Sequence, residues 1–387
     1  MGSGEDRVAE AIAMNGTALY NIGFVLEQAL GHVTHAKNLQ TNVIRDPDVR
    51  AYWALIPFET HGLAARIPLY KSNWTVRAGL RARRSLSRLT KHATIDALFF
   101  HTQVPAVLAA DWMRRYPSVV SLDATPLQYD QLGSFYQHDP GPPWLERIKW
   151  QLNRRCFCLA RHLVTWSQWA KEGLIEGYGV PADKITVIPP GVNVHEWQRP
   201  TPRTPHEGPV KLLFVGANLE RKGGLLLLDA FRRLRPLGVE LHLVTKDQAP
   251  DEPGVFVYHG MQPNSAPLKA LYHQADIFVL PTFGDCLPMV LSEAAAAGLP
   301  AISTRVAAIP EIVRDNETGL LVPPGDVSAL TEALRRLVLR PDERLRFGEQ
   351  ARSHVARMYD ARHNAGRLLD VIKGEIELSR SKERIPA

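Results

Sequence analysis

Short apolar runs alternate with longer amphipathic segments along the whole chain. In the first half the apolar runs lie at 18–27, 96–101, 118–126, 162–167 and 184–191. A segment of helical length follows most of these runs, and after the first one Gly31 and polar residues predict a loop that opens into a helix. Such repeated strand and helix alternation is typical of a parallel sheet that is covered by helices on both faces.

The pattern is interrupted once and then restarts. Between Pro189 and Pro209 the chain holds six prolines and shows little apolar periodicity, which predicts a domain boundary. After it, strands are predicted at 210–216, 239–245, 254–260, 276–282 and 300–306, and helices at 224–234, 266–275, 288–298 and 328–339. We expect an N-terminal domain over residues 1–195, a C-terminal domain over 196–364, and a last helix at about 365–387 that packs back on the first domain.

Length and composition narrow the class of protein. A chain of 387 residues exceeds the size at which one hydrophobic core usually stops growing, and 45% hydrophobic with 22% charged residues is the balance of a folded protein. No apolar run approaches the roughly 20 residues that cross a bilayer, and the start MGSGEDRVAE lacks the features of a signal peptide. Three cysteines provide neither a disulfide framework nor zinc-ligand spacing. We therefore expect a cytoplasmic protein.

The segment FVGANLERKGG, residues 214–224, places a basic pair between a strand and a helix. The strand ends at Gly216, and Arg221 and Lys222 follow the turn. Backbone N–H groups at a helix start and two positive side chains favour an anion such as a phosphate or a diphosphate. An exposed charged turn explains this segment equally well when it is taken alone.

A second segment, at 278–313, adds two acidic residues with seven residues between them. Asp285 is expected in the loop after a strand, and Glu293 about one and a half turns into the following helix. The N–H groups of Cys286 and Leu287 can bind phosphate oxygens, while a glutamate carboxylate can accept hydrogen bonds from a ribose. The alanine run after Glu293 explains close packing of the helix on the sheet, but it does not require two acids.

Together these motifs resemble those of the retaining glycosyltransferases of family 4, whose fold is named GT-B. The likeness spans roughly 160–345 and includes the Arg221-Lys222-Gly223 motif, the Asp285 to Glu293 pair and Pro310-Glu311-Ile312-Val313. It implies an α/β fold with two doubly wound Rossmann-like domains that face each other across a cleft.

The resemblance also implies roles for these residues. Arg221 and Lys222 would hold the diphosphate of the donor and stabilise the leaving group, and Glu293 would bind the ribose. Asp285 stands in place of a glutamate whose loop contacts the donor sugar. The remaining donor-binding candidates are Gly216, Cys286, Leu287 and Gly31.

The chain departs from the family pattern at two points. Cys286-Leu287-Pro288 replaces the family's Gly-Phe-Gly, so that one backbone donor is absent. Ala217 replaces an arginine that many members carry, and Arg221 can supply that charge. These departures, with Asp285, keep open the alternative of a catalytically silent partner subunit.

The N-terminal half offers further candidates for catalysis. Gly31 occupies the place of the fold's glycine loop, and His32 could donate a hydrogen bond to a donor or acceptor oxygen. The loop that ends the segment at 118–126 holds Asp123, at a place where many family members have a histidine near the reacting sugar. Asp123 could bind a sugar or acceptor hydroxyl, or it could only cap a turn with Thr125. His101, at the end of the run at 96–101, is a third candidate, whereas His35 is a weaker one, and a structural role is open for each histidine.

The activity implied by the resemblance is transfer of a hexose from a UDP- or GDP-sugar to a hydroxyl acceptor, which could be a glycan, a lipid or a small molecule. The anomeric configuration would be retained, and no metal or other cofactor is expected, because catalysis would rest on neutralising the diphosphate and positioning the substrates. A nucleotide-sugar epimerase or hydrolase of the same architecture is an alternative. The single Asp-x-Asp, Asp46 to Asp48, contains a proline and is expected to be a surface turn.

The stretch from Arg66 to His92 holds eight basic residues and no acidic one. As a helix it would carry a basic stripe, and such a helix with aromatic neighbours can lie on an anionic membrane surface. The predicted contact residues are Trp74, Arg77, Arg81, Arg84 and Arg88. The alternative is a helix that packs on the sheet and exposes its basic face to water. No nucleic-acid partner is expected, because no recognised binding module accompanies the stretch.

Overall fold

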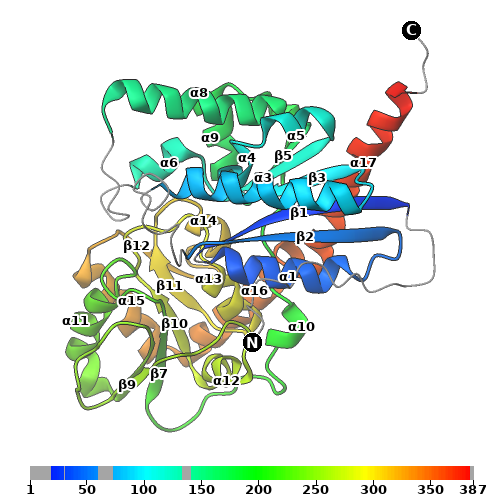
Figure 1. The fold of residues 1–387 in the computed structure, drawn as a ribbon. Coiled ribbons are helices and arrows are strands. Elements are labelled where there is room, and N and C mark those ends of the chain that lie inside the picture. The colour runs from blue at the N-terminus through cyan, green and yellow to red at the C-terminus, as the bar shows by residue number, and fades with distance from the viewer. Residues whose placement is uncertain (1–18, 30, 60–72, 133–140, 384–387) are drawn as a thin grey trace, which may run out of the picture. The chain divides into compact units, whose positions relative to one another are not determined.

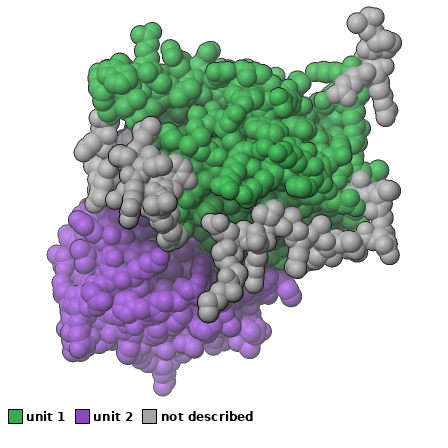
Figure 2. Space-filling view, in the orientation of Figure 1, with its two compact units in different colours: residues 1–128, 140–189, 362–387 green, residues 129–139, 190–361 purple. Residues whose placement is uncertain are grey.

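The computed structural model describes residues 19–29, 31–59, 73–132 and 141–383. The chain divides into two compact units, each built around its own sheet (Figure 1). Unit 1 comprises residues 1–128, 140–189 and 362–387, and unit 2 comprises residues 129–139 and 190–361 (Figure 2). Both sheets have six parallel strands, which confirms the α/β class predicted from the alternation of apolar runs and helical segments.

The sheet of unit 1 has the strand order β2-β1-β3-β4-β5-β6. Its strands are β1 (Tyr20–Gln28), β2 (Val49–Pro57), β3 (Ala97–His101), β4 (Ser118–Leu122), β5 (His162–Thr165) and β6 (Ile185–Val187). The helices are α1 (His32–Val43), α3 (Trp74–His92), α4 (Gln103–Ala106), α5 (Ala110–Arg115), α8 (Pro143–Leu159), α9 (Gln168–Tyr178) and α17 (Ala361–Glu383), and α6 (Pro126–Gln131) begins in unit 1 and ends in unit 2. β3 and β4 are buried at every position, as expected for strands covered on both faces.

Two hydrophobic clusters cover the two faces of this sheet. Residues of α3, α8 and α9 form one cluster, while α1 and α17 contribute to the other (Figure 1). α17 supplies five buried side chains, Ala365, Leu368, Leu369, Ile372 and Ile376. Lys373 of α17 also donates to Asp46 at 2.7 Å, and Asp46 accepts from the Asp48 N–H at 3.1 Å. The Asp-x-Asp segment is therefore a surface turn, as predicted.

The sheet of unit 2 has the order β12-β11-β10-β7-β8-β9. Its strands are β7 (Val210–Val215), β8 (Val239–Val244), β9 (Val255–Tyr258), β10 (Ile277–Leu280), β11 (Ala301–Thr304) and β12 (Gly319–Val322). The helices are α10 (Val194–Trp197), α11 (Gly224–Leu234), α12 (Ala266–Gln274), α13 (Met289–Ala296), α14 (Ile309–Ile312), α15 (Val327–Leu339) and α16 (Pro341–Met358). In both units the carboxyl ends of parallel strands meet at one edge, where ligands bind in folds of this class.

Within the described part of the chain, no helix is both long enough and apolar enough to cross a membrane.

Candidate active site

The loop between β7 and α11 is folded tightly at Gly223. This residue has a φ of +75°, and an added Cβ would lie 2.0 Å from the carbonyl oxygen of Pro281. The side-chain oxygen of Asn218 accepts a hydrogen bond from the N–H of Arg221 at 2.7 Å. Only glycine tolerates this φ together with this close approach to Pro281. Gly223 therefore determines the backbone path of the loop that carries Arg221 and Lys222.

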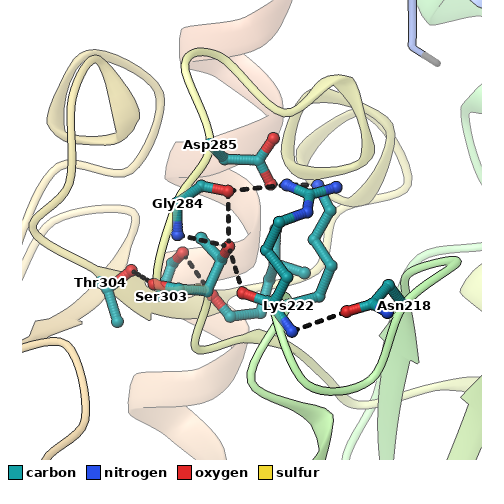
Figure 3. A network of polar contacts seen from close by, with 9 residues as sticks. Asn218, Lys222, Gly284, Asp285, Ser303 and Thr304 are labelled. Atoms are coloured by element: carbon teal, nitrogen blue, oxygen red, sulfur yellow. Dashed lines mark hydrogen bonds and ion pairs between the residues drawn. The ribbon is translucent and has the colours of Figure 1, made fainter. Parts of the chain in front are cut away.

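Both basic side chains of this loop lie against the loop that follows β10. Arg221 Nη1 donates to the carbonyl oxygen of Gly284 at 2.8 Å, and Lys222 Nζ forms an ion pair with Asp285 Oδ2 (Figure 3). The side chains of Lys222 and Asp285 are each 14% exposed. The structure thus brings together the predicted basic pair and the first predicted acid, which are 63 residues apart in sequence.

Buried hydroxyl groups hold the two loops together. Thr282 Oγ1 donates to the carbonyl oxygen of Arg221 at 3.2 Å and accepts from the Gly284 N–H at 3.3 Å. Thr304 Oγ1 donates to the Thr282 carbonyl oxygen at 2.6 Å. Ser303, also fully buried, donates to Leu280 from the same strand end (Figure 3). None of these hydroxyls was predicted, because a threonine in a strand is usually a packing residue.

The other predicted donor-binding residues of unit 2 have backbone and packing contacts. The Gly216 N–H donates to the Val244 carbonyl oxygen at 2.9 Å, and a Cβ at Gly216 would lie 2.8 Å from Phe214 Cζ and 3.1 Å from Lys222 Cβ. Glycine here therefore leaves room for both side chains. The side chains of Cys286 and Leu287 are buried, so that only their backbone groups are suited to bind a phosphate. That role stays a prediction.

Glu293 lies in the second turn of α13 and is 5% exposed. The phenol of Tyr272, on α12, donates to Glu293 Oε2 at 3.0 Å. Burial raises the pKa of Glu293 to about 7, and the Tyr272 hydrogen bond and the charge of Lys269 oppose this shift. The predicted ribose ligand is thus a buried carboxyl group that already has one phenol partner, and Tyr272 was not found from the sequence.

Unit 1 holds a second group of polar side chains, at the carboxyl ends of β1, β3 and β4. His32 Nδ1 lies 2.8 Å from His101 Nε2. His32 Nε2 lies 3.2 Å from Glu27 Oε1 and 3.9 Å from Asp123 Oδ2. Thr102 Oγ1 donates to Glu27 Oε2 at 3.1 Å. The structure therefore joins the predicted residues His32, His101 and Asp123 through a glutamate that was not predicted.

Burial controls the protonation of this group. The pKa of Glu27 is raised, mainly by desolvation; the charge of His32 opposes the shift and that of Asp123 adds to it. The pKa of His101 is held well below its ordinary value by burial and by the neighbouring histidines. In the described part of the chain, no group of three or more His, Cys, Asp or Glu side chains is placed to hold a metal ion.

His35 and His101 pack as rings around Trp166, which follows β5. The His101 ring stacks on Trp166 with centroids 4.9 Å apart, and His35 meets the same indole edge-on, also at 4.9 Å. Burial lowers the pKa of His35 to about 3. Both residues therefore have a structural role here, while His32 is the histidine closest to the acids.

Gly31 and Asp123 are two predicted neighbours of His32, one in sequence and one in space. Gly31 is the N-cap residue of α1 with a φ of −67°, and an added Cβ would meet no atom within 4 Å. Neither conformation nor packing requires glycine at this position. Thr125 bonds to Gln128 through its N–H at 3.0 Å and its hydroxyl at 3.1 Å, so it forms the predicted turn cap, whereas Asp123 lies near His32.

The structure corrects the predicted membrane-contact set on α3 at Arg77. This side chain is 5% exposed, and its guanidinium lies 5.0 Å from the ring centroid of Trp74 and 5.3 Å from that of Phe58. Arg77 is therefore an internal cation-π partner, and Trp74 is half-buried beside it. The periodicity placed Arg77 on a basic stripe, but aromatic residues cover the first turns of that stripe.

The rest of the basic stretch is divided between structural and exposed positions. Arg81 donates to the carbonyl oxygens of Pro57 and Glu59, whereas Arg84 and Arg88 are exposed. The first part of the basic stretch, residues 66–72, lies outside the described residues.

Two families of known proteins match successive parts of the chain. The family described as "Glycosyltransferase Family 4" matches residues 39–196, and "Glycosyl transferases group 1" matches residues 209–340. Curated relatives include an MMP α-(1→4)-mannosyltransferase of Mycolicibacterium hassiacum, 30% identical over 51% of this chain and 50% of its own length. A D-inositol 3-phosphate glycosyltransferase of Corynebacterium glutamicum is 31% identical over 50% of this chain and 52% of its length. The chain spans about half the length of the curated relatives it matches.

Solved structures share the fold at low sequence identity. A sucrose-phosphate synthase of Thermosynechococcus elongatus superposes with a TM-score of 0.72 at 16% identity, covering 92% of this chain and 98% of its own. HepE of Anabaena, solved in complex with UDP and glucose, has a TM-score of 0.66 at 15% identity, covering 92% of this chain and all of its own. The two family matches, in the order of the two sheets, show that the chain belongs to the family 4 glycosyltransferases, with two Rossmann-like domains of GT-B type.

Proposed function

We propose that this protein transfers a hexose from a nucleotide diphosphate sugar to a hydroxyl acceptor, with retention of anomeric configuration and without a metal ion. The observation that carries the proposal is the contact of Arg221 and Lys222 with the Gly284-Asp285 loop, at the carboxyl edge of the second sheet. Two cations before the N-terminus of α11 form a natural site for a diphosphate. The HepE complexes with UDP and UDP-glucose support a nucleotide sugar as the donor class.

In the proposed reaction the protein stabilises the charge of the leaving group and positions the two substrates. The bond between the anomeric carbon and the diphosphate oxygen breaks, and a bond to the acceptor oxygen forms on the same face. The acceptor proton passes to the leaving phosphate oxygen, so that no protein nucleophile is needed. Arg221 and Lys222 would stabilise the negative charge that develops on the leaving group.

Lys222 and Asp285 are proposed to bind different parts of the donor, the diphosphate and the sugar. A bound diphosphate would compete with Asp285 for Lys222, because both present oxygen anions to the same ammonium group. Asp285 would then be available to accept hydrogen bonds from hydroxyls of the donor sugar. Glu293 would bind the ribose through the carboxylate oxygen that Tyr272 does not occupy.

The cluster in unit 1 is proposed to bind a hydroxyl of the sugar or of the acceptor. His32 and Asp123 are the members with the most solvent access, at 9% and 10% of their side chains. Glu27 and His101 contact the two ring nitrogens of His32 and therefore set its orientation and tautomer.

A thermal-shift panel of UDP, GDP, ADP and dTDP with their hexose conjugates tests the donor proposal, without metal and then with magnesium. Ligands that bind the native state raise the melting temperature. We expect a shift with one nucleotide class in the absence of metal, and its loss in Lys222→Met. No shift with any nucleotide would contradict the proposal. A shift without turnover in an acceptor screen would instead favour the silent partner subunit.

A further inference from the structure

Helix α8 has two apolar faces, and one of them packs into unit 1. Cys156 and Phe157 are buried in the hydrophobic cluster that α3 and α9 share. The indole N–H of Trp150 donates to the Gly177 carbonyl oxygen at 3.0 Å, and its ring stacks near Tyr178. These contacts account for the docking of α8 on the outside of unit 1 (Figure 1).

The opposite face of α8 exposes a second apolar stripe. Trp144 is 65% exposed, Ile148 44% and Leu152 38%. The three residues are spaced four apart, so at about 100° per residue they lie within roughly 80° of one another on the helix surface. Single exposed apolar residues are ordinary, but no other helix in the described parts of the chain exposes more than one large apolar side chain.

The charges of α8 are arranged around this stripe. The helix carries the basic residues Arg147, Lys149, Arg154 and Arg155. Its one acidic residue, Glu146, accepts hydrogen bonds from Lys149 at 2.7 Å and from the Gly141 N–H at 2.8 Å. Arg147 and Arg154 flank the stripe on one side, Arg155 continues it, and all three are exposed. The exposed face is therefore apolar and positive.

We propose that α8 binds the surface of an anionic lipid bilayer, with Trp144, Ile148 and Leu152 entering the interfacial layer and Arg147, Arg154 and Arg155 contacting lipid phosphates. Apolar burial and attraction to anionic lipid act together on such a helix. A second copy of the chain fits this face less well, because a twofold contact would bring the same arginines against each other.

The membrane contact proposed here lies on α8, whereas the sequence predicted one on α3. The exposed part of α3 includes Arg84 and Arg88, but only one large apolar side chain, Leu80, is exposed there. A basic surface without an apolar stripe is attracted to anionic lipid but has no apolar side chains to bury in the interfacial layer. The binding involves neither of the candidate substrate sites, so it can fail or hold independently of hexose transfer.

Vesicle sedimentation of the full chain tests the proposal, with phosphatidylcholine vesicles that contain or lack phosphatidylglycerol and with no nucleotide sugar present. We expect binding to the anionic vesicles at low salt and weaker binding at high salt. The double variant Trp144→Ala, Ile148→Ser should need roughly tenfold or more lipid for half-binding. Leu378→Ser, which changes an exposed residue of α17, should bind like the wild type.

The charges are tested in the same assay. Arg147→Gln with Arg154→Gln should weaken binding to anionic vesicles by roughly fivefold or more, and Arg84→Gln with Arg88→Gln should weaken it less. Failure of the wild type to bind anionic vesicles at low salt would overturn the proposal, as would unchanged binding of the folded Trp144→Ala, Ile148→Ser variant. A dimer that this variant dissociates, without any change in vesicle binding, would assign the stripe to a second copy instead.

Discussion

Lys222 and Asp285 form an ion pair that joins the loop after β7 to the loop after β10. Each side chain is only 14% exposed, so this pair is less screened by water than a surface pair. It connects the group proposed to bind the diphosphate with the group proposed to face the sugar.

Asp285→Asn should have opposite effects on diphosphate binding and on sugar transfer. Removal of a negative charge beside Lys222 should tighten binding of the cognate nucleoside diphosphate, by roughly threefold to tenfold, because the phosphate no longer competes with a carboxylate. Sugar transfer should fall at the same time. Calorimetric titration with the diphosphate and a product assay measure the two effects, and Glu220→Gln, at an exposed position of the loop after β7, serves as a control for local charge. Weaker binding of the diphosphate to Asp285→Asn would show that the aspartate orients the lysine.

Gly223→Ala should disturb the basic pair through the backbone. The alanine would have to adopt a φ of +75° and would bring its Cβ to 2.0 Å from the Pro281 carbonyl oxygen. We expect the free energy of unfolding to fall by about 2–4 kcal/mol and nucleotide binding to be lost. Gly238→Ala is the matched control, because Gly238 has a φ of +69° but no atom within 4 Å of an added Cβ.

The control should cost only about 1 kcal/mol, measured by urea unfolding of both variants. Equal losses in the two variants would mean that strain in φ, and not the approach to Pro281, determines the effect.

The sequence predicted the central strands better than the edges of the sheets. β1, β3, β4 and β5 are buried parallel strands, and their continuous apolar runs are visible without a structure. Of the four edge strands, β6 and β9 were predicted, whereas β2 and β12 were not. β2 is half-exposed along most of its length, and the buried run of β12, Gly319–Val322, has only three residues after its glycine. Such strands take their conformation from the neighbouring strand and leave a weak pattern in the sequence.

The candidate site was predicted only where its residues follow a strand in an obvious loop. Arg221, Lys222 and Asp285 belong to this class, and the carboxyl ends of β7 and β10 bring them together. Glu27 was hidden at the end of an apolar strand, and the partner of Glu293, Tyr272, belongs to a separate helix. Contacts of this kind depend on tertiary packing that one sequence does not encode in its local pattern.

Glu293→Gln should remove a pH dependence of stability. The pKa of Glu293 is about 7 in the native state and 4.5 as a reference, so between these values the native state holds a proton that the unfolded state has lost. The contribution of Glu293 therefore makes the wild type less stable as the pH rises from about 4.5 to 7, by up to about 1.4 kcal/mol per pH unit. Glutamine does not ionise, so the variant should gain stability relative to the wild type across this window.

Urea unfolding at intervals from pH 4.5 to 8 measures this difference. Glu332→Gln on α15 is a suitable control, since that side chain is 71% exposed. A difference between Glu293→Gln and the wild type that stays constant across the window would show that Glu293 is ionised throughout.

His35→Phe should change the acid stability of unit 1. Among the described residues neither ring nitrogen of His35 has a hydrogen-bond partner, and the ring packs against His101 and Trp166. Phenylalanine can keep these ring contacts. Because burial lowers the pKa of His35 from 6.5 to about 3, the unfolded state binds a proton in this range that the native state does not. The wild type therefore loses stability as the pH falls below about 6.5, and the variant should lose less, by up to about 1.4 kcal/mol per pH unit.

The same substitution at an exposed histidine shows whether the change in pH dependence requires a buried histidine. His92→Phe, at the end of α3, should leave the slope of stability against pH unchanged between pH 6.5 and 4. Part of the acid sensitivity should remain in His35→Phe, because the pKa of His101 is also held well below its ordinary value. If the slopes of His35→Phe and the wild type coincide, His35 is protonated in the native state, and its contacts with His101 and Trp166 cannot be those of a neutral ring.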